Sequence, residues 1–179
     1  MFESGKEQGI SDVLAHKEQR LMFQEKLLSQ FVGKSLVTLT LNIPGPIKSN
    51  ADLIHLFDMG RAEINQLIQA LSWRVIYEKA LYLDSGNDGF WIIDESPKLI
   101  KEQLINIEEK IAIARLFDMD VSFEVEGKLI QISRKELNKQ PRRCLLCQTE
   151  AKICARSRKH SVAELQYEIE RLFREEKQK

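Results

Sequence analysis

Long apolar runs are missing from this sequence of 179 residues. No stretch approaches the roughly 18 consecutive apolar residues that a membrane-spanning helix needs. The first twenty residues, MFESGKEQGISDVLAHKEQR, are also too polar for a secretory signal peptide. We therefore expect a cytoplasmic protein with no membrane partner.

Cysteine is scarce, aromatic residues make up only 7% of the chain, and the net charge is zero. The three cysteines all lie within residues 144–154, which argues against a disulfide framework and for reduced thiols or metal ligands. Few aromatics and no overall basic charge make a nucleic-acid partner unlikely on composition. With 43% hydrophobic and 30% charged residues, the chain is not disordered, and we expect a single domain over residues 1–179.

The zero net charge hides one strongly basic segment, residues 139–160. Seven basic residues stand there against one acidic residue, Glu150, which gives a local charge of +6. The basic residues are Lys139, Arg142, Arg143, Lys152, Arg156, Arg158 and Lys159. Such a segment attracts phosphates, nucleic acid or an acidic protein, so it is a candidate docking surface.

The hydrophobic pattern alternates between helix and strand periodicity along the chain. Helices are predicted at about 11–31, after the turn at 44–50, from Pro97 onward and near the C-terminus; strands are predicted at 35–43, 74–84, 89–95, 119–126 and 128–133, with a turn at 85–88. The core order of strand, helix, strand, strand, helix, strand is that of a ferredoxin-like split β-α-β fold. We expect an α+β core (βαββαβ) over about 35–132. A basic, cysteine-containing segment and a final helix follow over about 139–177.

Two aspartates in the segment ARLFDMDV (114–121) are candidate metal ligands. In an extended strand Asp118 and Asp120 lie on one face, about 7 Å apart, opposite the apolar Met119 and Val121. Two carboxylates at this spacing can bind Mg²⁺, which prefers hard oxygen ligands and neutralises phosphate charge. The alternative is that this acidic face is ordinary solvated surface.

The loop NIPGPIK (42–48) joins the first strand to the next helix. Lys48 and the amides at the N-terminus of that helix could bind a phosphate, helped by the helix dipole. The loop lacks the glycine spacing of a P-loop or a dinucleotide fingerprint. A rigid structural turn containing Gly45 explains it equally well.

The segment PRRCLLCQTEAKICARSRKH (141–160) contains Cys144, Cys147, Cys154 and His160, a possible tetrahedral zinc site. If residues 144–157 form one helix, however, Cys144 and Cys154 are about 15 Å apart along its axis and cannot share an ion. We favour this packed helix, with flanking arginines that bind phosphate, and we expect no stoichiometric zinc in the purified protein.

Together, the RRCLLC…CARSRKH, ARLFDMDV and NIPGPIK segments resemble the citrate lyase holo-acyl-carrier-protein synthase family, CitX, over roughly residues 35–165. The resemblance implies a nucleotidyltransferase-type enzyme that moves a prosthetic group from 2′-(5″-triphosphoribosyl)-3′-dephospho-CoA to a serine of the citrate lyase acyl carrier protein (gamma subunit). Diphosphate is the other product. The reacting hydroxyl then belongs to the partner, which explains why this chain shows no Ser-His-Asp pattern.

Matching the motifs to this chain gives candidate site residues. Catalysis is assigned to Arg115, Asp118, Asp120 and His160, substrate binding to Gly45, Lys48, Arg142, Arg143, Arg156 and Arg158, and Mg²⁺ to Asp118 and Asp120. One departure is Ala114, where the family usually has glycine, so a positive φ would be disfavoured there. Two other classes stay open, a zinc-dependent nucleic-acid-binding module and an assembly factor for the lyase without catalysis.

Overall fold

The computed structural model describes residues 1–147 and 149–178. Its strands form one antiparallel sheet in the order β2-β3-β1-β4-β5. The strands are β1 (Ser35–Leu41), β2 (Val75–Leu83), β3 (Gly86–Ile93), β4 (Phe117–Val125) and β5 (Lys128–Gln131). The helices are α1 (Ile10–Gln30), α2 (Ala51–Ala70), α3 (Pro97–Lys110), α4 (Ala151–Arg156) and α5 (Val162–Lys177), with 3-10 turns at Ala112–Leu116 and Arg134–Leu137.

This topology confirms the predicted split β-α-β core. The central strand β1 pairs with β3 on one side and with β4 on the other, both antiparallel. Helix α2 links β1 to β2, and α3 links β3 to β4, as the βαββαβ order requires. Strand β5 extends the sheet beyond β4, and the extra helices precede and follow the core.

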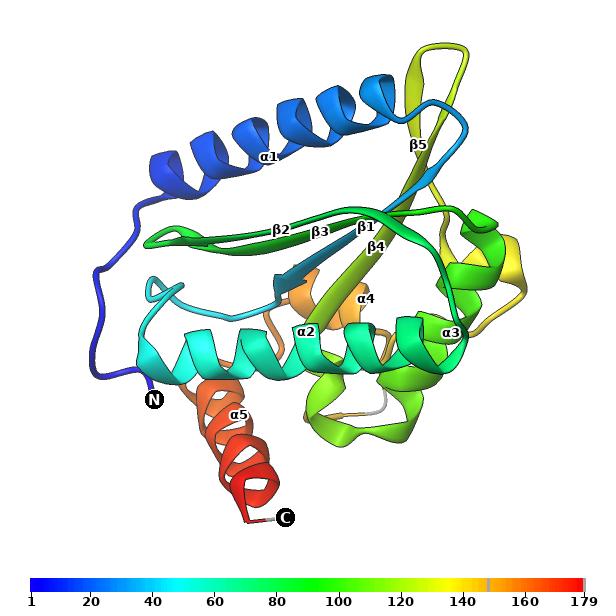
Figure 1. Cartoon of the computed structure of the whole chain (residues 1–179). Coiled ribbons are helices and arrows are strands. Elements are labelled where there is room, and N and C mark those ends of the chain that lie inside the picture. The colour runs from blue at the N-terminus through cyan, green and yellow to red at the C-terminus, as the bar shows by residue number, and fades with distance from the viewer. Residues whose placement is uncertain (148, 179) are drawn as a thin grey trace.

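Helix α1 covers one face of the sheet, and α2 and α3 cover the other (Figure 1). Alternation along β1 produces both interfaces, because successive side chains point to opposite faces. Val37 and Leu39 belong to the larger core with α2 and α3, whereas Leu36 packs with Leu27 and Leu28 of α1. Each fully buried aliphatic side chain contributes about 1.5–3 kcal/mol, so both helical layers are firmly attached.

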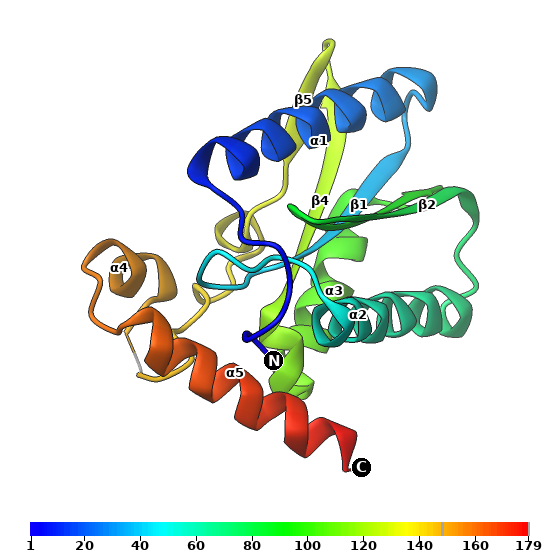
Figure 2. The same ribbon diagram turned by 90° about the vertical axis from the view of Figure 1, so that its left-hand side faces the viewer.

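Helix α5 closes the molecule below α2 and α3. Its start is a capping box, in which the Ser161 side chain accepts from the Glu164 backbone and Glu164 accepts from the Ser161 backbone. Its buried residues Ile169, Leu172 and Phe173 join the larger core. Figure 2 shows α4 and α5 on the side of the molecule where the N-terminal residues run down from α1.

Two sequence predictions need correction. Strand β3 begins at Gly86, so Asn87 and Asp88, which were predicted to form a turn, are buried strand residues that pair with β2. The alternation along 119–126 predicts that Val125 faces the core with Met119 and Val121, but Val125 is 45% exposed, because the β4–β5 hairpin projects past the helices (Figure 1). None of the described helices is both long and apolar enough to span a bilayer.

Candidate functional site

A pocket of about 220 Å³ lies between α1 and the sheet. Its basic side chains come from α1 and from the loop after β1. They are His16, Lys17, Arg20 and Lys48. Asp118 of β4 also lines it, together with Thr40 at the end of β1. This concentration of positive charge next to a half-exposed carboxylate suits a bound polyphosphate.

A buried ion-pair network holds α1 in place beside this pocket. His16 Nε2 lies 2.7 Å from Asp88 Oδ2, and its Nδ1 lies 3.0 Å from the Ser85 carbonyl oxygen. Arg20 donates to the other Asp88 oxygen at 2.7 Å. Because both imidazole nitrogens face oxygen acceptors, this arrangement favours the doubly protonated, charged ring. The hydrogen bond to Asp88 therefore raises the pKa of His16, although burial opposes the shift.

This raised pKa predicts a pH-dependent stability. The pair contributes fully below the ordinary histidine pKa of about 6.5, and its contribution is lost as the pH rises through the higher pKa of the folded state. The urea concentration at the midpoint of unfolding should therefore decrease as the pH is raised from about 6 to about 9. His16→Gln should remove most of this pH dependence. A His55→Gln variant, at an exposed position on α2, is the control. An unchanged slope in His16→Gln would show that other groups set it.

Lys48 lines the first pocket, but the neighbouring helix N-terminus does not serve it as predicted. The Asn50 side chain caps α2 by accepting from Leu53 N at 2.9 Å, and its amide donates to the Met1 carbonyl. Lys48 Nζ donates to the Ile43 carbonyl at 2.6 Å, and burial lowers its pKa. The N-terminus of α2 is therefore closed by its own cap, and Lys48 is the basic residue of this loop that lines the pocket.

Gly45 allows the chain to turn after β1, and it is not among the residues that line either of the two pockets described in this section. Its φ is +92°, a conformation that favours glycine. A Cβ there would stand 2.5 Å from Gln166 Nε2, which donates to the Pro44 carbonyl. The structural-turn interpretation of Gly45 is therefore the better one, and the turn docks against α5.

A second pocket, of about 500 Å³, lies between the basic segment and the start of α5. Four arginines line it together with apolar side chains: Arg115, Arg142, Arg143 and Arg158. Arg156, a predicted phosphate ligand, is exposed on α4 and is not among the lining residues. The prediction for Arg156 assumed one continuous helix through residues 144–157. That assumption is wrong, because α4 contains only Ala151–Arg156.

The two pockets meet at an ion pair. Asp118 lines the first pocket and Arg142 the second, and their side chains are joined at 3.3 Å; Asn42 lines both. Arg142 also donates to Glu108 of α3, whose side chain is only 3% exposed and which accepts from Arg134 too. We call Asn42, Asp118 and Arg142, together with Asp120, the junction; Asp120 lies two positions after Asp118 on β4 and is not among the residues that line either pocket.

Asp118 and Asp120 share one face of β4, as predicted, and their side chains are 45% and 43% exposed. Lys101 of α3 is buried beside them. Its Nζ donates to the Met119 carbonyl at 2.6 Å and lies 3.8 Å from Asp120. Burial lowers the pKa of Lys101, while burial and the charge of Asp118 raise the pKa of Asp120. The acidic face is thus a charged, partly enclosed site and not simple solvated surface.

Arg115 reaches the cysteine segment without contacting either aspartate. Its guanidinium donates to the carbonyls of Arg143 and of Cys144, the latter at 2.9 Å. Ala114 before it is fully buried in the 3-10 turn, and it is not among the described residues with positive φ. Alanine is therefore compatible with this position, and Arg115 positions the basic segment.

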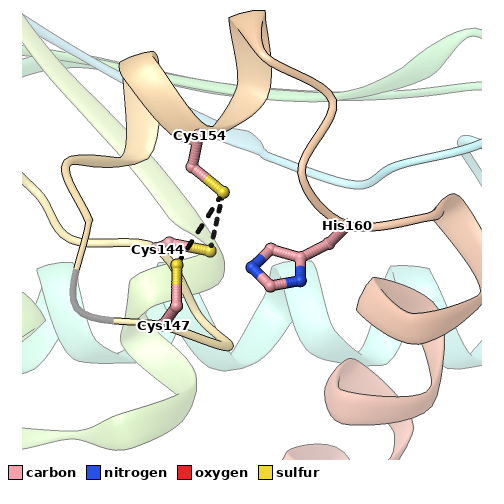
Figure 3. Close-up of side chains that lie close together, drawn as sticks. All are labelled: Cys144, Cys147, Cys154 and His160. Atoms are coloured by element: carbon pink, nitrogen blue, oxygen red, sulfur yellow. Dashed lines mark hydrogen bonds between the residues drawn. The ribbon is translucent and has the colours of Figure 1, made fainter.

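The predicted helix through residues 144–157 is wrong. Cys144 and Cys147 precede α4 in irregular backbone, and only Cys154 lies on that helix. The Cys154 Sγ is 3.4 Å from the Cys144 Sγ and 4.0 Å from the Cys147 Sγ. His160 points its Nε2 toward the three sulfurs (Figure 3). The prediction that these residues cannot share an ion depended on that helix, so it is also wrong.

Sequence reasoning missed the residues supplied by the helices: His16, Lys17, Arg20, Lys101 and Glu108. A signal for α1 was present, because His16, Arg20 and Gln24 recur every four residues and so share a helix face with Leu27 and Leu28. A polar stripe continuing a buried apolar face indicates partners across the interface. Nothing comparable marks Lys101, whose burial depends on the free edge of β4.

Comparisons with known proteins agree on one family. The family model of CitX, apo-citrate lyase phosphoribosyl-dephospho-CoA transferase, matches residues 8–176. A probable apo-citrate lyase phosphoribosyl-dephospho-CoA transferase of Streptococcus pyogenes is 36% identical over 173 residues, covering 96% of this chain and 88% of that protein. A probable transferase of the same name from Vibrio cholerae is 36% identical over 164 residues, covering 91% and 90%.

A longer relative contains a similar part. Protein CitXG of Leuconostoc mesenteroides is 34% identical over 174 residues, which cover 96% of this chain and 36% of that protein. The family match extends over nearly all of the described fold, including both pockets, the junction and the cysteine segment. The chain therefore belongs to the apo-citrate lyase phosphoribosyl-dephospho-CoA transferase family, CitX.

Proposed function

We propose that this protein transfers the phosphoribosyl-dephospho-CoA group from 2′-(5″-triphosphoribosyl)-3′-dephospho-CoA to a serine of the citrate lyase acyl carrier protein. Diphosphate leaves in the same step, as in a nucleotidyltransferase. Membership of the CitX family supports the reaction. The observation that supports a location for the reaction is the Arg142–Asp118 ion pair, where a basic pocket and a larger, more apolar pocket meet.

The two pockets suit the two ends of this substrate. The smaller, with His16, Lys17, Arg20 and Lys48, fits the part of the triphosphate that leaves as diphosphate. The larger has room for the dephospho-CoA end, and Arg158 and Leu165 offer it a charged and an apolar wall. In this arrangement the attacked phosphorus lies at the junction.

The residues at the junction also fit a magnesium ion. Asp118 and Asp120 offer hard oxygen ligands on one strand face, and burial together with the charge of Asp118 raises the pKa of Asp120. We assign both carboxylates as ligands of Mg²⁺, and each also lies beside one cationic side chain, Asp118 beside Arg142 and Asp120 beside Lys101. Bound there, the ion would neutralise phosphate charge that develops during transfer.

The remaining groups divide the work of binding and proton transfer. Arg142 is placed to donate to the phosphoryl oxygens, since it already spans the junction. The carrier serine oxygen forms the new bond to phosphorus, the bond to diphosphate breaks, and the hydroxyl proton passes to a junction carboxylate. His160 was the predicted alternative base, but its Nε2 faces the cysteines instead.

We assign docking of the carrier to the basic segment. Arg156, Arg158 and Lys159 are exposed in this segment, Arg158 also lines the larger pocket, and an acidic partner would meet these side chains first. The alternative of a zinc-dependent nucleic-acid-binding module is not favoured, because the family match covers this segment as part of a transferase.

Transfer to purified apo carrier tests the proposal. We expect the carrier mass to increase by the phosphoribosyl-dephospho-CoA group, with one diphosphate released per carrier and no reaction when the acceptor serine is replaced by alanine. If the carrier stays unmodified in the presence of Mg²⁺ and substrate, the proposed transfer is contradicted, and the alternative of a non-catalytic assembly factor for the lyase is favoured.

The same assay tests the smaller pocket. Lys48→Met should raise the KM for the triphosphoribosyl substrate by about 10- to 100-fold, because one charge-assisted phosphate contact is lost. Lys26→Met, which removes an exposed lysine of α1 away from the pocket, is the matched control. Equal KM values in the two variants would exclude Lys48 from binding this substrate.

A further inference from the structure

Four potential metal ligands converge between the basic segment and α5. The sulfurs of Cys144, Cys147 and Cys154 and a nitrogen of His160 all lie within 4.8 Å of one another. They come from separate pieces of backbone: two from the irregular stretch before α4, one from α4, and one from the turn before α5. Figure 3 shows the three sulfurs and the imidazole turned toward a common centre.

The spacing of these atoms matches a tetrahedral ion. With zinc–sulfur bonds of about 2.3 Å at tetrahedral angles, neighbouring sulfurs stand about 3.8 Å apart. The measured Sγ–Sγ distances are 3.4 Å for Cys144 and Cys154 and 4.0 Å for Cys147 and Cys154. Free thiols are weak hydrogen-bonding groups, so they have little reason of their own to gather in threes.

The histidine supplies an independent observation. His160 Nε2 is buried and has no hydrogen-bond partner among the described residues. Leaving such a group unsatisfied costs about 1–3 kcal/mol, and buried polar groups are rarely left so without a ligand or water. Because this nitrogen faces the sulfurs, one ion in the centre satisfies it and all three thiolates together.

The segment has little apolar packing of its own, although Leu145 packs, partly buried, against the larger core. Among the described residues of 141–161, the only buried side chains are Cys144 and Cys154 themselves. The large apolar residues Leu146 and Ile153 are exposed. A stretch of about twenty residues with a two-turn helix and no apolar core is typical of small metal-stabilised modules, in which binding energy replaces a hydrophobic core.

We propose that Cys144, Cys147, Cys154 and His160 bind one structural Zn²⁺ ion. Binding displaces the three thiol protons, and the resulting Cys₃His–Zn²⁺ centre carries a net charge of −1. All four positions are taken by protein ligands, so the centre is closed and takes no part in the transfer chemistry. This site goes beyond the proposed function and does not depend on it.

The metal has a defined structural task. Cys144, Cys154 and His160 also line the larger pocket, and Arg142 and Arg143 directly precede the first ligand. Zinc therefore fixes the backbone from which these arginines extend. Arg115 supports the same stretch by donating to the Cys144 carbonyl at 2.9 Å. The anionic centre in turn partly balances the surrounding arginines.

Metal content of the purified, reduced protein tests the site without any activity measurement. We expect about one zinc per chain by elemental analysis, a fall in melting temperature on chelation and its recovery with added Zn²⁺. Cobalt substituted for zinc should give the intense visible absorption of tetrahedral thiolate coordination. Protein with less than about 0.1 zinc that takes up none under reducing conditions would overturn the proposal, as would stoichiometric iron.

Variants separate the ligand set from general stability. His160→Asn should weaken Zn²⁺ affinity by about 10- to 100-fold or more in competition with a chromophoric chelator, by removal of a ligand. His55→Asn is the matched control, because His55 is exposed on α2 and outside the cluster, and its affinity should equal that of the wild type. Equal affinity in the two variants would overturn the four-ligand assignment even if the protein binds zinc.

Discussion

Replacing either junction aspartate should reduce transfer by about a thousandfold or more while leaving the fold intact. In Asp118→Asn and Asp120→Asn the shape of the side chain stays, but a hard, charged oxygen ligand is lost where phosphoryl charge develops. Both side chains are nearly half exposed, so their ion pairs contribute no more than about 1 kcal/mol to stability. The loss should appear in kcat, with KM for the carrier little changed.

Glu126→Gln is the control for this pair. Glu126 is an exposed carboxylate at the turn between β4 and β5, and its loss should leave the rate unchanged. Rates and melting temperatures of the three variants should be compared at saturating Mg²⁺. If both aspartate variants retain wild-type kcat, the reaction does not take place at the junction.

Arg142→Met should lower both the transfer activity and the free energy of unfolding. The Arg142 guanidinium pairs with the buried Glu108 and with Asp118, so its removal leaves Glu108 with Arg134 as its remaining cationic partner. Breaking a buried pair from one side costs about 3–5 kcal/mol, and the remaining partner should reduce this to about 2 kcal/mol. We expect transfer to fall by about a hundredfold or more.

A double variant separates these two effects. In Arg142→Met combined with Glu108→Gln, the uncompensated buried charge is gone, so the free energy of unfolding should recover in part. Transfer should not recover, because the donor at the junction is still missing. Arg174→Met, which removes an exposed arginine of α5 outside both pockets, should keep both properties. Recovery of transfer in the double variant would show that Arg142 acts only through stability.

The fold could be predicted from the sequence because its signals are local. The β-branched and leucine content of SLVTLTL, the alternation in MDVSFEVE, Pro97 at the start of α3 and the helix periodicities were enough to predict the element order, and that order has few compact solutions. The start of β3 was misplaced because Ser85 to Asp88 have turn composition. Burial of Asp88 against His16 of α1 overrides that local preference.

The site was only partly predictable because most of it is made by contacts distant in sequence. Motif or alternation marked Asp118, Asp120, Lys48 and Arg142 as candidates, and the structure places Asp118 and Lys48 at the smaller pocket and Arg142 at the larger one. The burial of Lys101 and Glu108 depends on how α3 lies beside β4, which no local pattern encodes. The prediction for the cysteines was wrong because their spacing was interpreted as a helix face, whereas irregular backbone before α4, with bends at residues 145–147 and 149, brings them together.

The position of β1 in the middle of the sheet also sets the order in which the chain can fold. Leu36 pairs with Ser122, so one edge of β1 stays open until β4 has been synthesised. Only the β2–β3 and β4–β5 hairpins form between neighbouring segments. Such high contact order slows folding, and an apolar strand such as SLVTLTL with open edges favours association between chains. We therefore expect the yield of refolding to fall steeply as protein concentration rises, with aggregates nucleated by this strand.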